Sequence, residues 1–271
     1  MLLSIDVGNT RTKWALFNAA GQIQQQAACL NQVLAAADLS ASTLGYTRVI
    51  ISNVAGPKLA TLLTEKLTPC ARPIHWMQST AQAAGLVNSY MPSASLGSDR
   101  WAALIAAWQI KHAPCVVVNA GTAVTIDALS IDSRLNSGRF LGGLIMPGLD
   151  LMQHSLGLAT AQLPKGNTVP PTPAPAEIFA TSTTAAIYAG AIFAVLGAIT
   201  QMAHALQQQC QKTPSVIISG GNAALIYQQL KHNPVINSLM LDASIVDSLV
   251  LQGLYLADHF MQDDFMQGES L

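Results

Sequence analysis

The chain has 271 residues, of which 51% are apolar and only 10% are charged, and its formal net charge is −1. This length allows two modest domains or one large one, and the apolar excess favours a well-buried protein that also buries surface in an oligomer. A near-zero charge with scattered basic residues provides no field that attracts nucleic acid or an anionic membrane. We therefore expect neither nucleic acid nor a membrane among its partners.

The cysteine and histidine residues form no metal-binding pattern. The four cysteines are far apart, no Cys-x-x-Cys occurs, and the histidines lack metal-ligand spacing. Isolated cysteines are typical of buried side chains in a reducing compartment. The opening Met-Leu-Leu-Ser-Ile-Asp lacks the basic region of a signal peptide. We expect a cytoplasmic protein.

Short apolar runs separated by turn residues dominate the first half of the chain. Gly8-Asn9-Thr10 and Asn18-Ala19-Ala20-Gly21 have the composition of tight turns. The strands predicted around them are Leu2–Asp6, Thr12–Phe17, Gln22–Ala28, Val49–Ser52 and Pro73–Met77. Helices are predicted at 58–67 and 98–111.

The opening pattern recurs near residue 113. Cys115–Asn119 and Val124–Leu129 flank Ala120-Gly121-Thr122 in the way that the first two predicted strands flank the Gly8 turn. In both places an apolar strand ends in a side-chain oxygen, and a glycine turn leads into another strand. This pattern predicts a duplicated α/β fold. We expect domains at residues 1–112 and 113–258, followed by a flexible tail at 259–271.

The second half contains a long uncharged stretch between Glu177 and Lys212, which is long enough to span a bilayer. Its Ala, Thr and Gly content, its glutamines and the absence of flanking basic clusters favour a buried helix of a soluble protein instead. The proline-rich segment Pro164–Pro175 predicts a surface loop. A strand at Val216–Ser219, a Gly220-Gly221 turn and a helix at Ala223–Leu230 follow.

Glycine turns at strand ends suit the binding of a nucleotide triphosphate. Backbone N–H groups approach phosphate oxygens closely only where no Cβ intervenes. Gly8 and Gly121 supply such turns from the two halves, and Gly220-Gly221 would let an adenosine lie against backbone. The sequence contains no Gly-x4-Gly-Lys-Ser/Thr and no Gly-x-Gly-x-x-Gly, which disfavours a P-loop or a Rossmann site.

Five motifs together carry a family resemblance. They are Asp6-Val7-Gly8-Asn9-Thr10, Gly97-Ser98-Asp99-Arg100, Gly121-Thr122-Ala123-Val124-Thr125-Ile126-Asp127, Gly142-Gly143-Leu144-Ile145-Met146-Pro147-Gly148 and Ser219-Gly220-Gly221. In this order and spacing, over residues 2–253, the chain resembles the type III pantothenate kinases. The resemblance implies an α/β fold of two duplicated ribonuclease-H-like (actin-like ATPase) domains, with mixed sheets flanked by helices. It also implies a homodimer that phosphorylates pantothenate with ATP, the entry step of coenzyme A synthesis, using Mg²⁺ and an activating K⁺ or NH₄⁺.

The resemblance also implies roles for individual residues. Asp99 is the implied general base, since a carboxylate can take the proton of a hydroxyl nucleophile, and Asp6 is implied to hold Mg²⁺ through water. The residues implied to line ATP are Asp6, Val7, Gly8, Asn9, Thr10, Arg11, Thr12, Lys13 and Thr122. Those implied to contact pantothenate are Tyr90, Gly97, Ser98, Asp99, Arg100 and Thr183. The structural alternatives are a turn-forming Asp6, a first-turn helix acid at Asp99, a surface ion pair at Arg100, ordinary packing of Tyr90 and a helix cap at Thr183.

Asn119 departs from the family pattern, which has an aspartate there that helps to bind the monovalent cation. Asparagine keeps one oxygen ligand and loses the charge. Counting eight strand residues at ~3.3 Å each places Asp127 about 26 Å away, too far to replace the missing carboxylate. The hypothesis is a lower dependence on K⁺ or NH₄⁺, or a weaker kinase.

Two other functions stay open. A non-catalytic relative of the same fold, acting as a regulatory or accessory protein, is motivated by Asn119, while Asp6, Asp99 and Arg100 argue against it. A kinase of another small hydroxy substrate is disfavoured by Gly97-Ser98-Asp99-Arg100, which follows the pantothenate kinase pattern.

Overall fold

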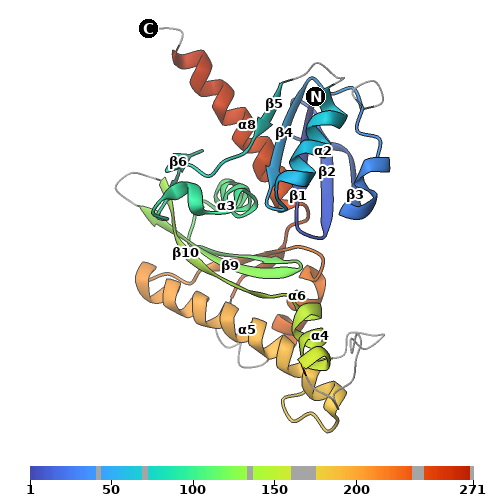
Figure 1. The fold of residues 1–271 in the computed structure, drawn as a ribbon. Helices are drawn as coiled ribbons and strands as arrows, with labels where there is room; N and C mark the ends of the chain where they lie inside the picture. Colours follow the sequence, from blue (N-terminus) through green and yellow to red (C-terminus); the bar gives the residue numbers. More distant parts are fainter. Residues whose placement is uncertain (41–43, 69–72, 133–136, 160–174, 234–240, 269–271) are drawn as a thin grey trace. The chain divides into compact units, whose positions relative to one another are not determined.

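The computed structural model (Figure 1) describes residues 1–40, 44–68, 73–132, 137–159, 175–233 and 241–268. Contacts between residues divide the chain into two units, residues 1–110 with 248–271 and residues 111–247. Cys70 and all but the last residue of the proline-rich segment Pro164–Pro175 lie outside the described residues.

A five-stranded mixed sheet forms the frame of the first unit. Its strand order is β3-β2-β1-β4-β5, in which β1, β2 and β3 are antiparallel neighbours and β4 and β5 continue the sheet in parallel. The strands are β1 (Leu2–Val7), β2 (Arg11–Phe17), β3 (Ile23–Leu30), β4 (Arg48–Asn53) and β5 (Ile74–Trp76). The five strands predicted for this half are confirmed within two residues at most ends.

Side chains alternate along β1, so the two faces of this sheet carry different kinds of residue. Leu3, Ile5 and Val7 point to one face, where they pack in a core with Leu63 and Leu67 of helix α2 (Pro57–Leu67). The intervening side chains of β1 point to the other face because successive strand residues alternate. Ser4 and Asp6 of β1 and Ser52 of β4 therefore share the face that does not carry α2.

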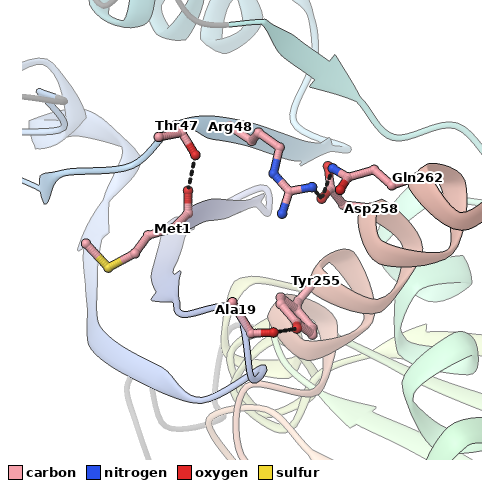
Figure 2. Close-up of polar contacts among 7 residues, drawn as sticks. All are labelled: Met1, Ala19, Thr47, Arg48, Tyr255, Asp258 and Gln262. Atoms are coloured by element: carbon pink, nitrogen blue, oxygen red, sulfur yellow. Dashed lines mark hydrogen bonds and ion pairs between the residues drawn. The ribbon is translucent and has the colours of Figure 1, made fainter. Parts of the chain in front are cut away.

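Helices α3 (Ser98–Lys111) and α8 (Leu249–Gly268) complete the first unit. Helix α8 contacts β1, β2 and β4, and Figure 2 shows two of its polar attachments. The Tyr255 hydroxyl donates to the Ala19 carbonyl at 3.1 Å, and Arg48 pairs with Asp258 at 2.9 Å. At Gly253, a Cβ would collide with the Ala102 carbonyl of α3, so only glycine allows the two helices to approach this closely.

This arrangement corrects the expected C-terminal boundary. Residues 248–258 belong to the first unit and not to the second, and helix α8 continues through residues 259–268, where a flexible tail was expected. The physical reason is tertiary packing. Residues of α8 such as Leu249, Leu251, Leu254 and Ala257 are buried, which stabilises a helix beyond its intrinsic propensity.

The second unit repeats the strand order of the first. Its sheet contains β10-β9-β8-β11-β12, again with three antiparallel neighbours followed by two parallel ones. The strands are β8 (Cys115–Ala120), β9 (Ala123–Asp132), β10 (Ser137–Pro147), β11 (Ser215–Ser219) and β12 (Ala243–Ile245). The repetition of one topology is the ribonuclease-H-like duplication that the sequence predicts.

Helix α5 (Thr183–Cys210) lies along one face of this second sheet (Figure 1). Its Ile192, Val195 and Ile199 pack in one core with Val118 and Ile126 of the sheet. Helices α4 (Leu149–Ala159) and α6 (Ala223–His232) extend this core. By length and composition α5 could cross a membrane, but this buried side is typical of the core helix of a globular protein.

Four further elements are short, and the long strand β10 was not predicted. The strands β6 (Gln82–Ala83) and β7 (Leu86–Asn88) form a small hairpin, and η1 (Asn31–Ala36) and η3 (Ser93–Ser95) are 3-10 turns. Strand β10 is eleven residues long. It was not predicted because its three glycines lower the strand propensity, and Gly142, with φ 141°, adjoins a register shift.

Candidate active site

The first glycine turn joins β1 to β2. The Gly8 N–H donates to the Arg11 carbonyl at 3.1 Å, which closes the turn. Asn9, Thr10 and Arg11 are exposed at its tip. Exposed backbone in a tight turn can present N–H groups to an anion, so this turn has the form expected of a phosphate-binding segment.

Asn31, at the start of η1, attaches this turn to the sheet and was not predicted as a site residue. Its Nδ2 donates to the carbonyls of Gly8 at 2.8 Å and Asn9 at 3.1 Å, and its backbone N–H donates to the carbonyl of Thr10 at 3.1 Å. The Thr12 hydroxyl donates to Asn31 Oδ1 at 2.8 Å. Asn31 therefore binds the carbonyls of three consecutive turn residues, two through its side chain and one through its backbone N–H.

Asp6 lies two residues before Gly8 and is paired with Lys13 across the hairpin. Its pKa is raised from 3.8 to about 7, first by burial and next by the negative charge of Asp99, while Lys13 opposes the shift. Two carboxyl groups that repel each other in a partly buried place favour a divalent cation, because the cation relieves both the repulsion and the desolvation. The residues present thus fit Mg²⁺.

Ser52 connects the strand that carries Asp6 to the helix that carries Asp99. It is fully buried and is the parallel partner of Asp6 on β4. Its hydroxyl is hydrogen-bonded to that of Ser98, the first residue of α3, at 2.8 Å. Ser52 was not predicted, and its partner lies 46 residues away in the sequence.

Asp99 occupies the first turn of α3 and is partly buried. Burial raises the pKa of its carboxyl group, and hydrogen bonding to the Arg100 N–H and the charge of Arg100 oppose the rise. The Arg100 N–H donates to Asp99 Oδ1 at 2.8 Å. A Cβ at Gly97 would lie 2.6 Å from the same oxygen, so the glycine leaves the room that the carboxylate occupies.

Arg100 and Tyr90 lie together beside this carboxylate. The Arg100 Nη1 donates to the Tyr90 hydroxyl at 3.2 Å, and its guanidinium carbon lies 5.5 Å from the centre of the Tyr90 ring. Arg100 is only 6% exposed, which contradicts the alternative of a surface ion pair. A guanidinium held against an aromatic ring is a preorganised donor for a carboxylate or phosphate.

The second glycine turn, between β8 and β9, is one residue shorter than the first. The Gly121 N–H donates to the Ala123 carbonyl at 3.0 Å, and Thr122 is exposed at the tip. Two other glycines pack against this turn. A Cβ at Gly148 would lie 2.6 Å from the Thr122 carbonyl, and one at Gly220, where φ is +99°, would lie 2.6 Å from the Ala120 carbonyl.

The register of β8 and β9 corrects the expected position of Asp127. Asn119 is paired with Thr125, and Asp127 with Val117, so Asn119 and Asp127 lie on the same face of the sheet as diagonal neighbours. Such neighbours are separated by roughly 7–8 Å, far less than the 26 Å expected from the extended count. That count was wrong because the hairpin reverses the chain. Asp127 is 2% exposed, and Ser219 flanks Asn119 on β11.

Thr183 is exposed in the first turn of α5 and does not cap the helix. The N-cap is Ser182, whose Oγ accepts from the Ala185 N–H at 3.2 Å. The cap alternative for Thr183 is therefore wrong. Among the residues that the structure describes, no three His, Cys, Asp or Glu side chains gather as a metal-binding group.

Comparison with known proteins identifies the family. A family model described as type III pantothenate kinase matches residues 2–205. The type III pantothenate kinase of Methylobacillus flagellatus is 39% identical over 245 residues, covering 90% of this chain and 94% of the relative. That of Nitrosospira multiformis is 38% identical over 244 residues, covering 89% and 88%.

Solved structures agree on the fold. A Campylobacter jejuni protein named for the Baf family of transcriptional activators superposes with a TM-score of 0.56 at 18% identity, covering 99% of this chain and 100% of that one. A Sinorhizobium meliloti protein named as a 2-dehydro-3-deoxygalactonokinase gives 0.54 at 13% identity, covering 96% and 99%. These identities support the fold alone, whereas the sequence matches extend over most of both chains. The chain therefore belongs to the type III pantothenate kinase family.

Proposed function

We propose that Asp99 is the general base with which this chain phosphorylates the primary hydroxyl of pantothenate. As a member of its family the chain is a kinase that uses ATP and acts in coenzyme A biosynthesis. The observation that carries the proposal is the grouping of Asp99 with Asp6, Arg100 and Tyr90 in the first unit. A raised pKa makes the Asp99 carboxylate a stronger base at neutral pH.

In the proposed reaction, Asp99 takes the hydroxyl proton as the new O–P bond forms on the γ-phosphorus and the bond to the β-phosphate oxygen breaks. The products are 4′-phosphopantothenate and ADP. Arg100, with Tyr90 behind it, binds the substrate carboxylate and thereby fixes the hydroxyl near Asp99. Gly97 and Ser98 line the same place, and the turn from Asp6 to Lys13 binds the phosphates of ATP. In the second unit, Thr122 is proposed to contact phosphate.

Mg²⁺ would be held at Asp6 through water, where it neutralises charge on the phosphates. Asp6 fits this role because it lies just before the phosphate-binding turn, and because a cation would offset the burial and the negative charge of Asp99 that raise its pKa. The Asp6 carboxylate would orient the hydrated ion through its water ligands.

We infer that Asn119 contributes a neutral oxygen to a monovalent cation, K⁺ or NH₄⁺, in the second unit. Support comes from the oxygen-bearing side chains on the same face of the sheet, which are Thr125, Asp127 and Ser219. Without a carboxylate at position 119 the cation binds more weakly, so the enzyme depends on it less.

A second copy of the chain is the proposed partner. An apolar groove of about 340 Å³ lies between α4 and α5, with Leu151, Leu156 and Ile187 in its lining. Leu151 is 50% and Leu156 41% exposed. Covering this groove in a homodimer would bury these side chains and bring Thr183 of α5 near the partner, where we infer that it contacts pantothenate. Light scattering of the purified protein measures the oligomeric state.

We propose a cytoplasmic location, with neither nucleic acid nor membrane as a partner.

The experiment that tests the proposed function is ATP-dependent phosphate transfer to pantothenate by the wild type and by Asp99→Asn. The two side chains have nearly the same shape, so we expect kcat to fall at least 100-fold with an unchanged melting temperature. Wild-type turnover of pantothenate that survives Asp99→Asn would exclude Asp99 as the base. A folded wild type that binds ATP without converting pantothenate would indicate a non-catalytic relative or another substrate.

A further inference from the structure

We propose that Asn31 is a positioning residue of the ATP site, which holds the turn of Gly8, Asn9 and Thr10 in the conformation that binds phosphate. The inference rests on the proposed function, because it takes this turn as the place of the phosphates. Asn31 is not part of the turn and lies about twenty residues beyond it, at the end of β3.

The three hydrogen bonds that Asn31 donates reach the same side of the turn. Its Nδ2 and its backbone N–H together serve the carbonyls of three consecutive residues, Gly8, Asn9 and Thr10, at 2.8, 3.1 and 3.1 Å. Three successive carbonyls that point in one direction are unusual in extended backbone, where neighbouring carbonyls alternate. The hydrogen bonds from Asn31 therefore stabilise this geometry.

The planar peptide bond turns this arrangement into an anion-binding surface. In a trans peptide, the carbonyl of one residue and the N–H of the next point in opposite directions. Because the carbonyls of Gly8, Asn9 and Thr10 face Asn31, the N–H groups of Asn9, Thr10 and Arg11 face away from it. Successive N–H groups aimed to one side form the concave site that holds phosphate oxygens.

The orientation of the Asn31 amide is itself determined. The Thr12 hydroxyl donates to Asn31 Oδ1 at 2.8 Å, and Thr12 is fully buried. Since Oδ1 accepts from Thr12, Nδ2 is the atom that faces the turn. Only an amide side chain can accept from the threonine and donate twice to carbonyls at the same time. Aspartate, which has the same shape, can accept but cannot donate.

The chain contains a matched control on the next turn of the same sheet. Asn18 closes the β2–β3 turn, where its Oδ1 accepts from the N–H groups of Ala20 at 3.0 Å and Gln22 at 2.9 Å. Like Asn31 it joins a side-chain amide to turn backbone, but this turn carries no residue of the proposed site. Asn18→Ala thus reproduces the loss of a turn-binding asparagine without touching the phosphate turn.

The experiment measures the dissociation constants of ATP and adenosine by calorimetry for the wild type, Asn31→Ala, Asn31→Asp and Asn18→Ala, together with KM for pantothenate. We expect Asn31→Ala and Asn31→Asp to raise the dissociation constant of ATP at least tenfold. The dissociation constant of adenosine and the KM for pantothenate should stay within twofold of the wild-type values. Asn18→Ala should leave all three values unchanged. If only one Asn31 variant folds, as judged by circular dichroism, that variant alone decides.

Unchanged ATP affinity in the folded Asn31 variants would overturn the inference, and so would an equal loss for ATP and adenosine or an equal effect of Asn18→Ala. This test of Asn31 gives an answer whether or not the proposed function is correct. A wild type that does not phosphorylate pantothenate refutes that function. The ratio of ATP to adenosine affinity still decides whether Asn31 organises a phosphate-binding turn.

Discussion

At the scale of single residues, the site depends on side chains that place other side chains. Three neighbouring residues fix the position of the Asp99 carboxylate, each in a different way. Gly97 leaves space beside its carboxylate, the Arg100 N–H donates to it, and Ser98 ties the start of α3 to Ser52 of β4. A reacting group that is misplaced by about 1 Å can lose 100-fold in rate, so we expect changes at these neighbours to lower the rate by displacing Asp99.

Ser52→Ala should lower kcat about tenfold and leave the dissociation constant of ATP unchanged. The reason is that the hydroxyl of Ser52 is hydrogen-bonded to Ser98, the first residue of α3, which adjoins Asp99. Steady-state kinetics and calorimetry measure the two quantities separately.

Ser4→Ala is the matched control for this change. Ser4 is also fully buried, lies on the same face of β1 as Asp6, and its hydroxyl has no hydrogen-bond partner among the described residues. Removing such a hydroxyl costs nothing or stabilises. Equal losses of kcat in both variants would show that any cavity in this sheet slows the enzyme, and would remove Ser52 from the mechanism.

Asp6 should give the stability of the nucleotide-free and Mg²⁺-free protein a distinct pH dependence. Its pKa is 3.8 in the unfolded chain and about 7 in the folded one, so the folded state holds the proton more tightly. The free energy of unfolding therefore falls as pH rises from about 4 to 7, by at most roughly 4 kcal/mol. Asp6→Asn should lack this fall, which thermal unfolding at a series of pH values measures. A parallel decline in both proteins would contradict the assignment.

The sequence identifies the residues of the motifs, but not the residues that hydrogen-bond to the motifs and fix their positions. Asp6, Asp99 and Arg100 stand in recognisable short patterns, and the structure brings the three together in the first unit. Asn31 and Ser52 stand in no pattern, because their partners lie 19 to 46 residues away in the sequence. Only the fold determines such pairs.

At the scale of elements, the two β-hairpins place the polar residues of each unit. Alternation predicts which strands exist, and the predicted hairpins at Gly8 and Gly121 are confirmed. The separation expected for Asn119 and Asp127 was wrong because the hairpin between them reverses the chain. Strand β10 escaped prediction because its glycines and its bulge interrupt the alternation.

The β8–β9 register leads to a prediction for Asn119→Asp. The new carboxylate would stand beside Thr125 and diagonal to Asp127, and would add the charge that a monovalent cation prefers. We expect the K⁺ concentration for half-maximal activity to fall roughly tenfold, equivalent to about 1.4 kcal/mol. Asn119→Ala, which removes the oxygen ligand as well, should weaken the response to K⁺. A wild type that responds to K⁺ as strongly as Asn119→Asp would refute the weaker cation site.

At the scale of the whole molecule, the first unit is assembled from both ends of the chain. Helix α8 brings Tyr255 onto Phe17 with 5.0 Å between the ring centres, and its hydroxyl reaches Ala19. The sequence suggests a duplication but places residues 248–258 in the second domain, because a linear pattern does not indicate which of two similar sheets a segment packs against.

Tyr255→Ala should destabilise the first unit by about 2–3 kcal/mol, through the loss of the ring stack and of buried area. Tyr255→Phe keeps the stack and loses only the exposed hydrogen bond to Ala19, so its cost should be about 0.5 kcal/mol or less. Hydrogen exchange resolved along the chain measures the effect in each unit. Equal loss of protection in residues 111–247 would show that α8 does not serve the first unit specifically.

The return of α8 also has a consequence for the order in which the protein is made. Residues 111–247 are contiguous, so that portion can reach its native state while the ribosome still holds the C-terminal segment. The N-terminal portion, although synthesised earlier, lacks its covering helix until translation ends. During this interval, side chains that contact α8 in the folded protein, such as Phe17, lack that contact, so we expect the nascent N-terminal sheet to bind chaperones.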